Sequence, residues 1–319
     1  MENNNTNSNN LYNETKSSSI YLKLLTEYSD IDLNIPIENI SYLNLFKCFK
    51  QTRRYSNIND LKGVIFTSLS IIINTIFYIV VNILLINYIY KNKNLLLFSI
   101  IFSSFTFILT IYCLFDVSTS IPGYQTGKTL TLEEFNSLKP TKKVNDIEFE
   151  LKYCKTCKLI RDIRTFHCNH CQICVLKHDH HCGFVSNCIG LKNYLIFIKF
   201  LIVCFIHCSY ICCTSILIMV KISKYSKDKK NELRFVIINL FNAIIMVFSG
   251  FFSFFLLGLI VQHIDSISKN ETTREAIKKK YNHKVFDKGC KENWKEICCN
   301  KNQLNMNLIE ENVDNNINL

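Results

Sequence analysis

Cysteine and histidine crowd into one short stretch of this chain. Seven of its 16 cysteines and five of its 8 histidines lie between residues 154 and 188. The stretch holds three Cys-x2-Cys steps, and such a step lets two thiolates from one turn bind a tetrahedral metal ion. Disulfides are the other common use of many cysteines, but they are typical of secreted domains, whereas this stretch is expected in the reducing cytosol. The spacing therefore predicts a metal-binding region.

A count of ligands bears on whether the stretch also holds a nucleophile. Two closed tetrahedral zinc sites need eight ligands. The stretch supplies them either as seven cysteines and one histidine, with no thiol to spare, or as three cysteines and one histidine at each site, which leaves one cysteine free. In the second case the free thiol would be Cys182, because the nearby Asp179 and His180 supply a carboxylate and an imidazole that can activate it.

Four long apolar segments must position this stretch. They are residues 64–90, 95–115, 195–220 and 235–261, and each is long enough to cross a hydrocarbon core of about 30 Å, which takes roughly 20 helical residues. We expect an all-α polytopic membrane protein with four transmembrane helices and a cytosolic, zinc-bound cysteine-rich domain between helices 2 and 3. The expected organisation is a partly disordered cytosolic N-terminal region at 1–63, helices 1 and 2 at 64–115, a cytosolic loop at 116–194 with the cysteine-rich domain at about 152–194, helices 3 and 4 at 195–261, and a cytosolic tail at 262–319.

The charge distribution predicts the orientation. The net charge is +11, and lysine and arginine gather before the first span, between the second and third, and after the fourth, so these parts are expected in the cytosol. The basic loop at 221–234 opposes this orientation. Residues 1–16 are polar and lack the apolar core of a cleavable signal peptide. We attribute the positive charge to contact with anionic lipid and expect no nucleic-acid partner.

The run CKTCKLIRDIRTFHCNHCQICVLKHDHHCGFVSNCIGLKNYLIF resembles the cysteine-rich domain of the DHHC family of protein S-acyltransferases, or palmitoyltransferases. The four-helix layout resembles that family too. The resemblance implies that Cys182 is the acylated nucleophile, that His180 is its base and that Asp179 orients the imidazole. His170 and His178 have no role in it, and we expect them to be solvated loop residues. It also implies two structural zinc ions, the first bound by Cys154, Cys157, His167 and Cys174 and the second by Cys168, Cys171, His181 and Cys188.

Two flanking segments carry the same resemblance. Thr272–Glu275 match the TTxE motif of the family, in which Thr273 is expected to touch the active site. The segment FDKGCKENWKEI resembles the C-terminal family segment, with Asn293 as its polar anchor. Cysteines of the tail, Cys290, Cys298 and Cys299, are candidates for S-acylation of the protein itself.

The chain departs from the family pattern at two places. Gly183 and Phe184 stand where the family has Pro-Trp, and Ile121 stands where it has the aspartate of Asp-Pro-Gly. Neither change removes an expected ligand or catalytic group. Glycine nevertheless frees the backbone beside the nucleophile, and phenylalanine lacks the indole donor.

The function implied by the resemblance is transfer of a long-chain acyl group from palmitoyl-CoA to protein cysteines through an acyl-Cys182 intermediate. The partners would be fatty acyl-CoA, membrane-associated proteins with cytosolic cysteines, and the bilayer of an endomembrane such as the Golgi. The acyl chain should lie among the spans, where Phe184, His207 and Thr273 are expected contacts and His207 would limit its length. His207 has a second interpretation, a hydrogen bond to a neighbouring helix. The alternative for the whole chain is an inactive zinc-stabilised membrane scaffold, which would need neither Cys182 nor His180.

Overall fold

The computed structural model describes residues 61–84, 93–225, 233–278 and 285–299, all within the compact unit Phe49–Leu319. Nearly all of the expected N-terminal region, the end of the first apolar segment, half of the basic loop at 221–234 and both chain ends lie outside the described residues. So does the side chain of Cys299.

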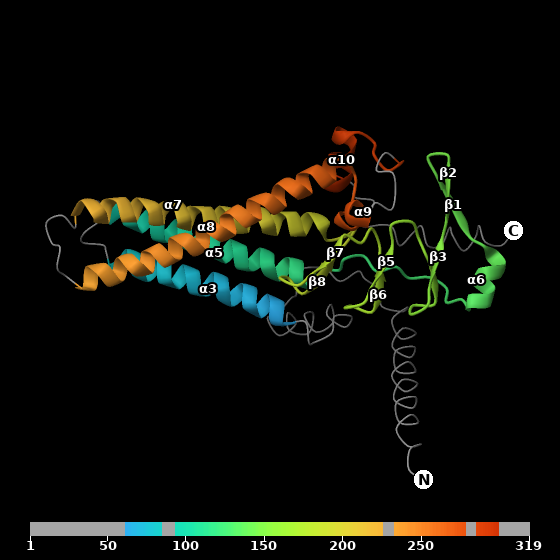
Figure 1. The fold of residues 1–319 in the computed structure, drawn as a ribbon, viewed down its shortest axis with the longest axis horizontal. Coiled ribbons are helices and arrows are strands. Elements are labelled where there is room, and N and C mark those ends of the chain that lie inside the picture. Colours follow the sequence, from blue (N-terminus) through green and yellow to red (C-terminus); the bar gives the residue numbers. More distant parts are fainter. Residues whose placement is uncertain (1–60, 85–92, 226–232, 279–284, 300–319) are drawn as a thin grey trace, which may run out of the picture. The chain divides into compact units, whose positions relative to one another are not determined.

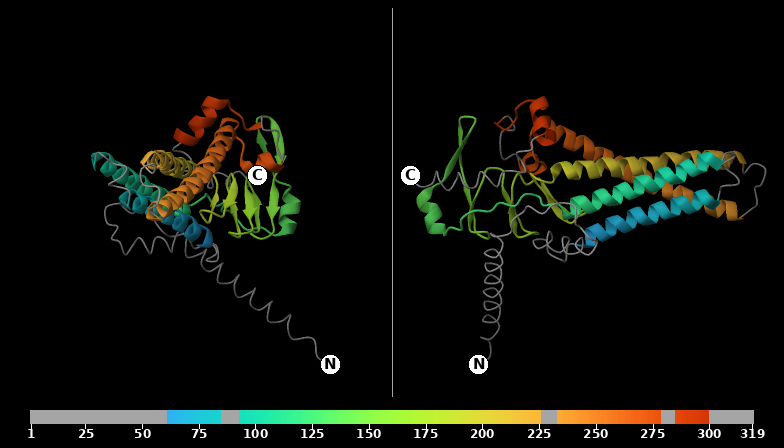
Figure 2. Two further views of the ribbon diagram at one scale, coloured as in Figure 1. Left: turned by 60° about the vertical axis from the view of Figure 1, so that its left-hand side comes forward. Right: turned by 180° about the vertical axis from the view of Figure 1, so that it is seen from behind.

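Four long helices form a bundle, as Figures 1 and 2 show from three directions. Each contains a stretch long and apolar enough to cross a membrane, with mean hydropathy between 2.1 and 2.6. The expected four-helix membrane fold is therefore confirmed. The fourth helix ends seven residues beyond its expected end at Val261. The helices are α3 (Leu61–Leu84), α5 (Lys93–Thr119), α7 (Tyr194–Tyr225) and α8 (Leu233–Ser268).

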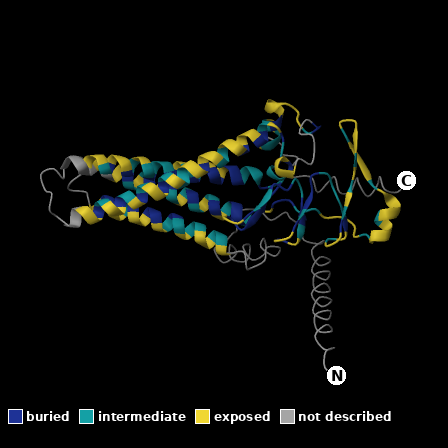
Figure 3. Cartoon of the chain, viewed as in Figure 1, coloured by how far each residue is buried: buried dark blue, intermediate teal, exposed yellow. Residues whose placement is uncertain are grey.

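The bundle carries its apolar side chains outward as well as inward. Phe66, Phe105 and Phe254 are among many large apolar residues that are exposed along the helices (Figure 3). Such a continuous apolar exterior suits lipid and not water. Polar side chains lie inside instead, where they pair: the hydroxyls of Tyr78 on α3 and Ser99 on α5 are 3.0 Å apart. The bundle is thus built for a bilayer.

Small elements fill the segment between α5 and α7. A short helix comes first and four two-stranded antiparallel hairpins follow it. The sequence did not indicate these strands, because most have three residues and little apolar alternation. The elements are α6 (Leu132–Leu138), β1 (Thr141–Val144), β2 (Ile147–Glu150), β3 (Lys152–Cys154), β4 (Leu159–Arg161), β5 (Phe166–Cys168), β6 (Ile173–Val175), β7 (His180–Cys182) and β8 (Asn187–Ile189); after α8 come α9 (Thr273–Lys278) and α10 (Cys290–Cys299).

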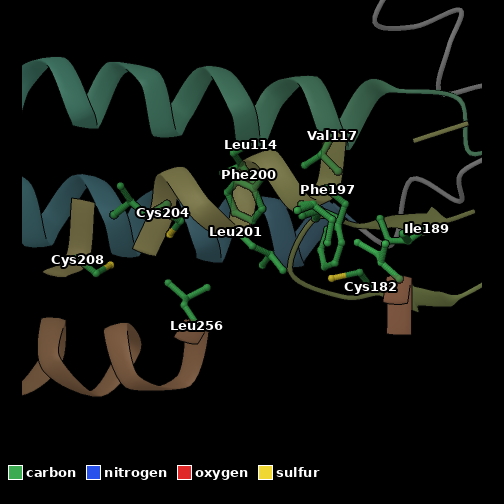
Figure 4. Packing of buried hydrophobic residues seen from close by; sticks show 14 residues of the cluster. Leu114, Val117, Cys182, Ile189, Phe197, Phe200, Leu201, Cys204, Cys208 and Leu256 are labelled. Atoms are coloured by element: carbon green, nitrogen blue, oxygen red, sulfur yellow. The ribbon is translucent and has the colours of Figure 1, made fainter. Parts of the chain in front are cut away.

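The last hairpin, β7–β8, is built into the end of the helix bundle. Figure 4 shows Cys182 and Ile189 beside Phe197 of α7 and Val117 of α5, in one buried apolar cluster. The amide nitrogen of Asn187 donates to the carbonyl oxygens of Val117 (3.0 Å) and Ser120 (2.8 Å) at the end of α5. Any chemistry at Cys182 is therefore positioned by the membrane helices.

Candidate active site and metal centres

Two groups of cysteine and histidine could each hold a metal ion. Their members are Cys154, Cys157, His167 and Cys174 in the first and Cys168, Cys171, His181 and Cys188 in the second, and within each group all ligand atoms lie within 4.8 Å of one another. In the second group the Nδ1 atom of His181 lies 3.5 to 3.8 Å from the three sulfur atoms. Ligands bound at about 2.0 to 2.3 Å in a tetrahedron are separated by distances of this size. The donor set and its geometry both fit Zn²⁺.

Each centre joins two consecutive hairpins. The β3–β4 turn supplies the Cys154 and Cys157 pair, and the next hairpin supplies His167 and Cys174, which face each other across β5 and β6. The second centre repeats this plan: its cysteine pair comes from the β5–β6 turn, and its other two ligands face each other across β7 and β8. Metal binding would therefore link three very short hairpins into one unit.

The pleat of β7 turns the metal ligand and the candidate catalytic residues to opposite faces of the strand. Successive side chains of a strand point to opposite faces. His181 points towards the second metal centre, so His180 and Cys182 point to the other face, towards the helices. This alternation explains how consecutive residues can divide into a ligand and a reactive pair.

Equivalent positions in the three hairpins lie 14 residues apart. Cys182 stands in the last hairpin at the position that is a metal ligand in the first two. Cys154 and Cys168 occupy the same place in the first two hairpins, and each of those sulfurs accepts a hydrogen bond from the backbone N–H three residues later, at 3.4 and 3.5 Å. In the third hairpin the residue three positions later is Val185, which is fully buried and offers no thiolate. Cys182 therefore lacks a second cysteine with which to bind metal.

Asp179, His180 and Cys182 form the candidate reactive group. Asp179 is buried, and its Oδ2 lies 2.7 Å from Nδ1 of His180. A carboxylate only accepts hydrogen bonds, so Nδ1 carries the proton and Nε2 remains as the base. The other carboxylate oxygen accepts the backbone N–H of Thr273 at 2.7 Å. The imidazole is thus held in one tautomer and one orientation.

The pKa values of this group favour a thiolate and imidazolium pair. Burial opposes charge on both side chains, but hydrogen bonds with Asp179 and Cys182 raise the pKa of His180 to about 9. Burial likewise raises the pKa of Cys182, and the His180 imidazole together with the N–H groups of Val185 and Phe184 outweighs it, so that the pKa of Cys182 is lowered. A low thiol pKa beside a base is the pattern of a nucleophilic cysteine.

Aromatic residues and a second histidine surround His180. Its ring packs edge-on against the ring of Phe197, with ring centres 5.5 Å apart, and its centre lies 6.2 Å from that of the His263 ring. The hydroxyl of Tyr194 lies 2.8 Å from Nδ1 of His263. Sequence reasoning missed His263, because the expected fourth span ended at Val261. A histidine in the extended end of an apolar helix was the signal that could have found it.

A buried ion pair fixes the segment that reaches Asp179. The guanidinium of Arg164 makes two hydrogen bonds, of 2.8 and 2.7 Å, with the carboxylate of Glu275. Burial opposes ionisation of Glu275, but Arg164 outweighs it and lowers the pKa of this carboxyl. Thr273, expected at the active site, contacts Asp179 with its backbone N–H and not with its side chain. Its hydroxyl is buried and has no hydrogen-bond partner among the described residues.

Asn293 anchors the C-terminal helix α10 to the end of α8. The residue is buried, and its amide nitrogen donates to the carbonyl oxygen of Ser268 at 2.8 Å and to Asp287 at 2.7 Å. Beside it, the indole of Trp294 donates to the Ser268 hydroxyl at 3.1 Å. Of the tail cysteines, Cys290 and Cys298 are exposed.

An apolar cavity of about 430 Å³ begins at Cys182 and runs between α3, α7 and α8. Figure 4 shows Cys182 at one end of a row of α7 residues that continues through Leu201 and Cys204 to Cys208. The three side chains expected to contact a substrate, Phe184, His207 and Thr273, all line this cavity.

Both interpretations of His207 agree with its position. It lines the cavity, and its Nε2 and Nδ1 lie 3.0 Å from the hydroxyls of Thr75 on α3 and Thr106 on α5. Thr75 donates its own proton to the carbonyl of Ile71 at 2.7 Å. It therefore accepts from Nε2–H. The Thr106 hydroxyl lies within hydrogen-bond distance of the carbonyl oxygens of Phe102 and Ser103 as well as of Nδ1. The His207 side chain thus links three helices.

The expectation of two solvated loop histidines was half wrong. His170 is exposed and stacks on His181, with ring centres 4.7 Å apart. His178 is only 2 % exposed, and its Nδ1 lies 3.4 Å from the guanidinium of Arg274. The packing of α9 on the hairpins buries it, which local polarity could not indicate.

Comparison with known proteins adds an independent finding. A family model described as DHHC palmitoyltransferase matches residues 147–280. The chain is similar to Palmitoyltransferase ERF2 of Kluyveromyces lactis (27% identical; 53% of this chain, 44% of that protein). It is also similar to Protein S-acyltransferase 8 (28%; 59% and 45%) and Probable protein S-acyltransferase 1 (34%; 57% and 52%), both of Arabidopsis thaliana. The matched segments span about half the length of these relatives.

Proposed function

We propose, from the premise that this chain is a DHHC-family protein, that it is a protein S-acyltransferase. It would transfer a long-chain acyl group from palmitoyl-CoA to cysteine thiols of membrane-associated proteins. The observation that carries this proposal is the position of Cys182, which is bonded to His180 in a group with Asp179 and also lines an apolar cavity. A scaffold would need neither feature.

The proposed reaction has two half-reactions with one intermediate. His180 takes the thiol proton of Cys182, and the thiolate attacks the thioester carbonyl of the acyl-CoA. The bond from the carbonyl carbon to the CoA sulfur breaks, CoA leaves with the proton, and the acyl group stays on Cys182 as a new thioester. A substrate cysteine then gives its proton to His180 and attacks this thioester. The acylated substrate leaves, and Cys182 regains its thiol.

Asp179 acts through His180. Its carboxylate holds Nδ1–H, so Nε2 faces the reacting thiols in both half-reactions. The Thr273 N–H donates to the same carboxylate, and thus α9 is a positioning element.

The two metal centres would hold Zn²⁺ with four protein ligands each, and the ions would supply folding energy to the hairpins. Four protein ligands close the shell of zinc. All acid-base chemistry is therefore assigned to the protein side chains.

The acyl chain would lie in the cavity between the helices. Each methylene removed from water contributes about 0.8 kcal/mol to binding. The affinity for the acyl chain therefore grows with its length, while the thioester stays beside Cys182. Phe184, His207 and Thr273 line this path, and His207 lies far from the rim, where it would limit chain length. The excess of lysine and arginine in the segment between α5 and α7 supports a cytosolic active site; a Golgi location rests on the family resemblance alone.

Formation of the acyl-enzyme tests the proposal. The purified protein in detergent is treated with a clickable palmitoyl-CoA analogue, and wild type is compared with Cys182→Ser for hydroxylamine-sensitive label and for zinc content. We expect the variant to lose the label and to keep about two zinc ions per chain. Equal labelling would move the chemistry to another cysteine. No labelling of folded, zinc-loaded wild type would favour the scaffold.

A further inference from the structure

One wall of the apolar cavity carries a line of polar side chains. Thr67, Ser70 and Asn74 follow one another on α3 at helical spacing, and all three line the cavity. The first two are satisfied within the protein: Thr67 donates to the carbonyl of Phe184 at 2.9 Å, and Ser70 to that of Phe66 at 2.8 Å. Asn74 differs from both.

The amide of Asn74 has no hydrogen-bond partner among the described residues, although the residue is only 8 % exposed. Other buried asparagines of the spans donate to backbone carbonyls: Asn82 to that of Tyr78 at 2.8 Å, and Asn242, whose Oδ1 has no partner among the described residues, to that of Ser215 at 3.0 Å. An unpaired amide in an apolar interior costs about 1 to 3 kcal/mol. A partner from the cavity would remove this cost.

The polar groups near Asn74 are already bonded to others, so a partner for its amide would have to come from the cavity. The next residue of α3, Thr75, is bonded to Ile71 and to His207. The second nitrogen of His207 is bonded to Thr106. A lone water molecule would find few partners here, because a buried water needs two to four polar groups.

The depth of Asn74 can be compared with the length of an acyl chain. Gly63 at the start of α3 lies against Gly183, the residue after Cys182. The eleven positions from Gly63 to Asn74 span about 16 Å at 1.5 Å per residue. An extended chain of single bonds of about 1.5 Å advances about 1.25 Å per carbon. Asn74 therefore lies near carbon 12 or 13 of a chain attached to Cys182.

We propose that Asn74 is a hydrogen-bonding subsite for long-chain acyl groups that carry a hydroxyl near carbon 12. An amide offers both a donor and an acceptor, which matches a hydroxyl group. The acyl chain brings this hydroxyl to Asn74 without the entropy cost of ordering a separate molecule. The inference rests on the proposed acyltransferase function and adds to it a preference for hydroxylated over plain fatty acyl thioesters.

A competition between thioesters of equal length tests this subsite. The full-length protein in detergent receives equal concentrations of hexadecanoyl-CoA and 12-hydroxyhexadecanoyl-CoA, and the two adducts on Cys182 are resolved by intact mass. One hydrogen bond predicts a threefold to tenfold preference for the hydroxylated chain. In a second competition, 2-hydroxyhexadecanoyl-CoA should show no such preference, because its hydroxyl lies near the rim.

Two substitutions complete the design. Asn74→Leu keeps the branching at Cγ but removes both hydrogen-bonding atoms, and it should abolish or reverse the preference for the 12-hydroxy chain. Ile71→Leu changes an apolar residue that lines the cavity on the same helix, and it should leave the preference unchanged. Equal use of the two chains by wild type, or the same preference in Asn74→Leu, would overturn the subsite while plain hexadecanoyl label still supports the acyltransferase. No label from any thioester would overturn both.

Discussion

Gly63, in the first turn of α3, lies against the turn that follows Cys182, the proposed nucleophile. An alanine Cβ at this position would lie 2.7 Å from the carbonyl carbon of Gly183 and would overlap the carbonyl oxygen. Carbon atoms in contact are about 3.5 to 4.0 Å apart, and the oxygen is closer still, so Gly63→Ala must displace the helix or the turn by at least about 1 Å. Two hydrogen bonds cross the same contact, from Val64 N–H to the Ser186 hydroxyl (3.2 Å) and from the Thr67 hydroxyl to the carbonyl of Phe184 (2.9 Å).

The expected cost is larger for chemistry than for stability. Overpacking costs about 1 to 3 kcal/mol, and alanine has a helix propensity about 1 kcal/mol better than glycine, so Gly63→Ala should lower the unfolding free energy by at most about 2 kcal/mol. A displacement of about 1 Å at a reacting group can reduce a rate about 100-fold. We therefore expect acyl-Cys182 formation to slow about 100-fold, which corresponds to about 2.7 kcal/mol of barrier.

The assay is the rate at which a clickable palmitoyl-CoA analogue labels Cys182, with the zinc content measured in parallel. Gly183→Ala is the matched control from the other side of the contact, since a Cβ there meets nothing within 4 Å. It should label within about twofold of wild type and so keep the barrier within about 0.4 kcal/mol. If Gly63→Ala is labelled at the wild-type rate with both zinc ions present, the close packing of α3 against this turn would be refuted.

Three further substitutions probe other contacts. Asp179→Asn should reduce acyl-enzyme formation by up to about 10⁴-fold at unchanged zinc content, because the amide no longer selects the Nδ1–H tautomer; a loss below tenfold would argue against this role. Glu275→Gln leaves Arg164 buried without its counter-charge and should lower the unfolding free energy by about 3 to 5 kcal/mol. Since the pKa of Glu275 is lowered in the fold, its contribution is present above the unfolded-state pKa and lost as pH falls through the folded value, so wild type and variant should converge in acid denaturation. His207→Leu removes two hydrogen bonds between helices and should lower the unfolding free energy by about 1 kcal/mol, seen as a lower thermal midpoint. An unchanged midpoint would contradict the role of His207 in linking the helices.

The membrane fold follows from the sequence because each span is an uncharged apolar run longer than a bilayer requires. The helix ends were harder to predict. His263 and Ser268 belong to α8 although charged and polar residues follow Val261, because Tyr194 of α7 bonds the His263 ring and Asn293 of α10 donates to the Ser268 carbonyl. Tertiary contacts, and not local hydropathy, set this end.

The division of roles within the cysteine-rich stretch needed the structure. Ligand counting left two assignments open, and the family resemblance implied one of them. The physical reason lies in the β7–β8 pairing, which turns His181 and Cys188 to one face and Cys182 to the other. Strands of three residues have too little pattern to be predicted. The Arg164 to Glu275 contact joins residues 111 positions apart, a separation at which local patterns carry no information.

The most direct test of the central claim is the release of CoA in the absence of a protein acceptor. Purified, zinc-loaded enzyme is mixed with excess palmitoyl-CoA, and free CoA is followed together with acylation of Cys182. An acyl-Cys182 intermediate predicts a burst of about one CoA per active chain, formed at the rate of Cys182 acylation and absent in Cys182→Ser. Release of CoA only after a cysteine-containing acceptor is added, with Cys182 unmodified throughout, would contradict the account.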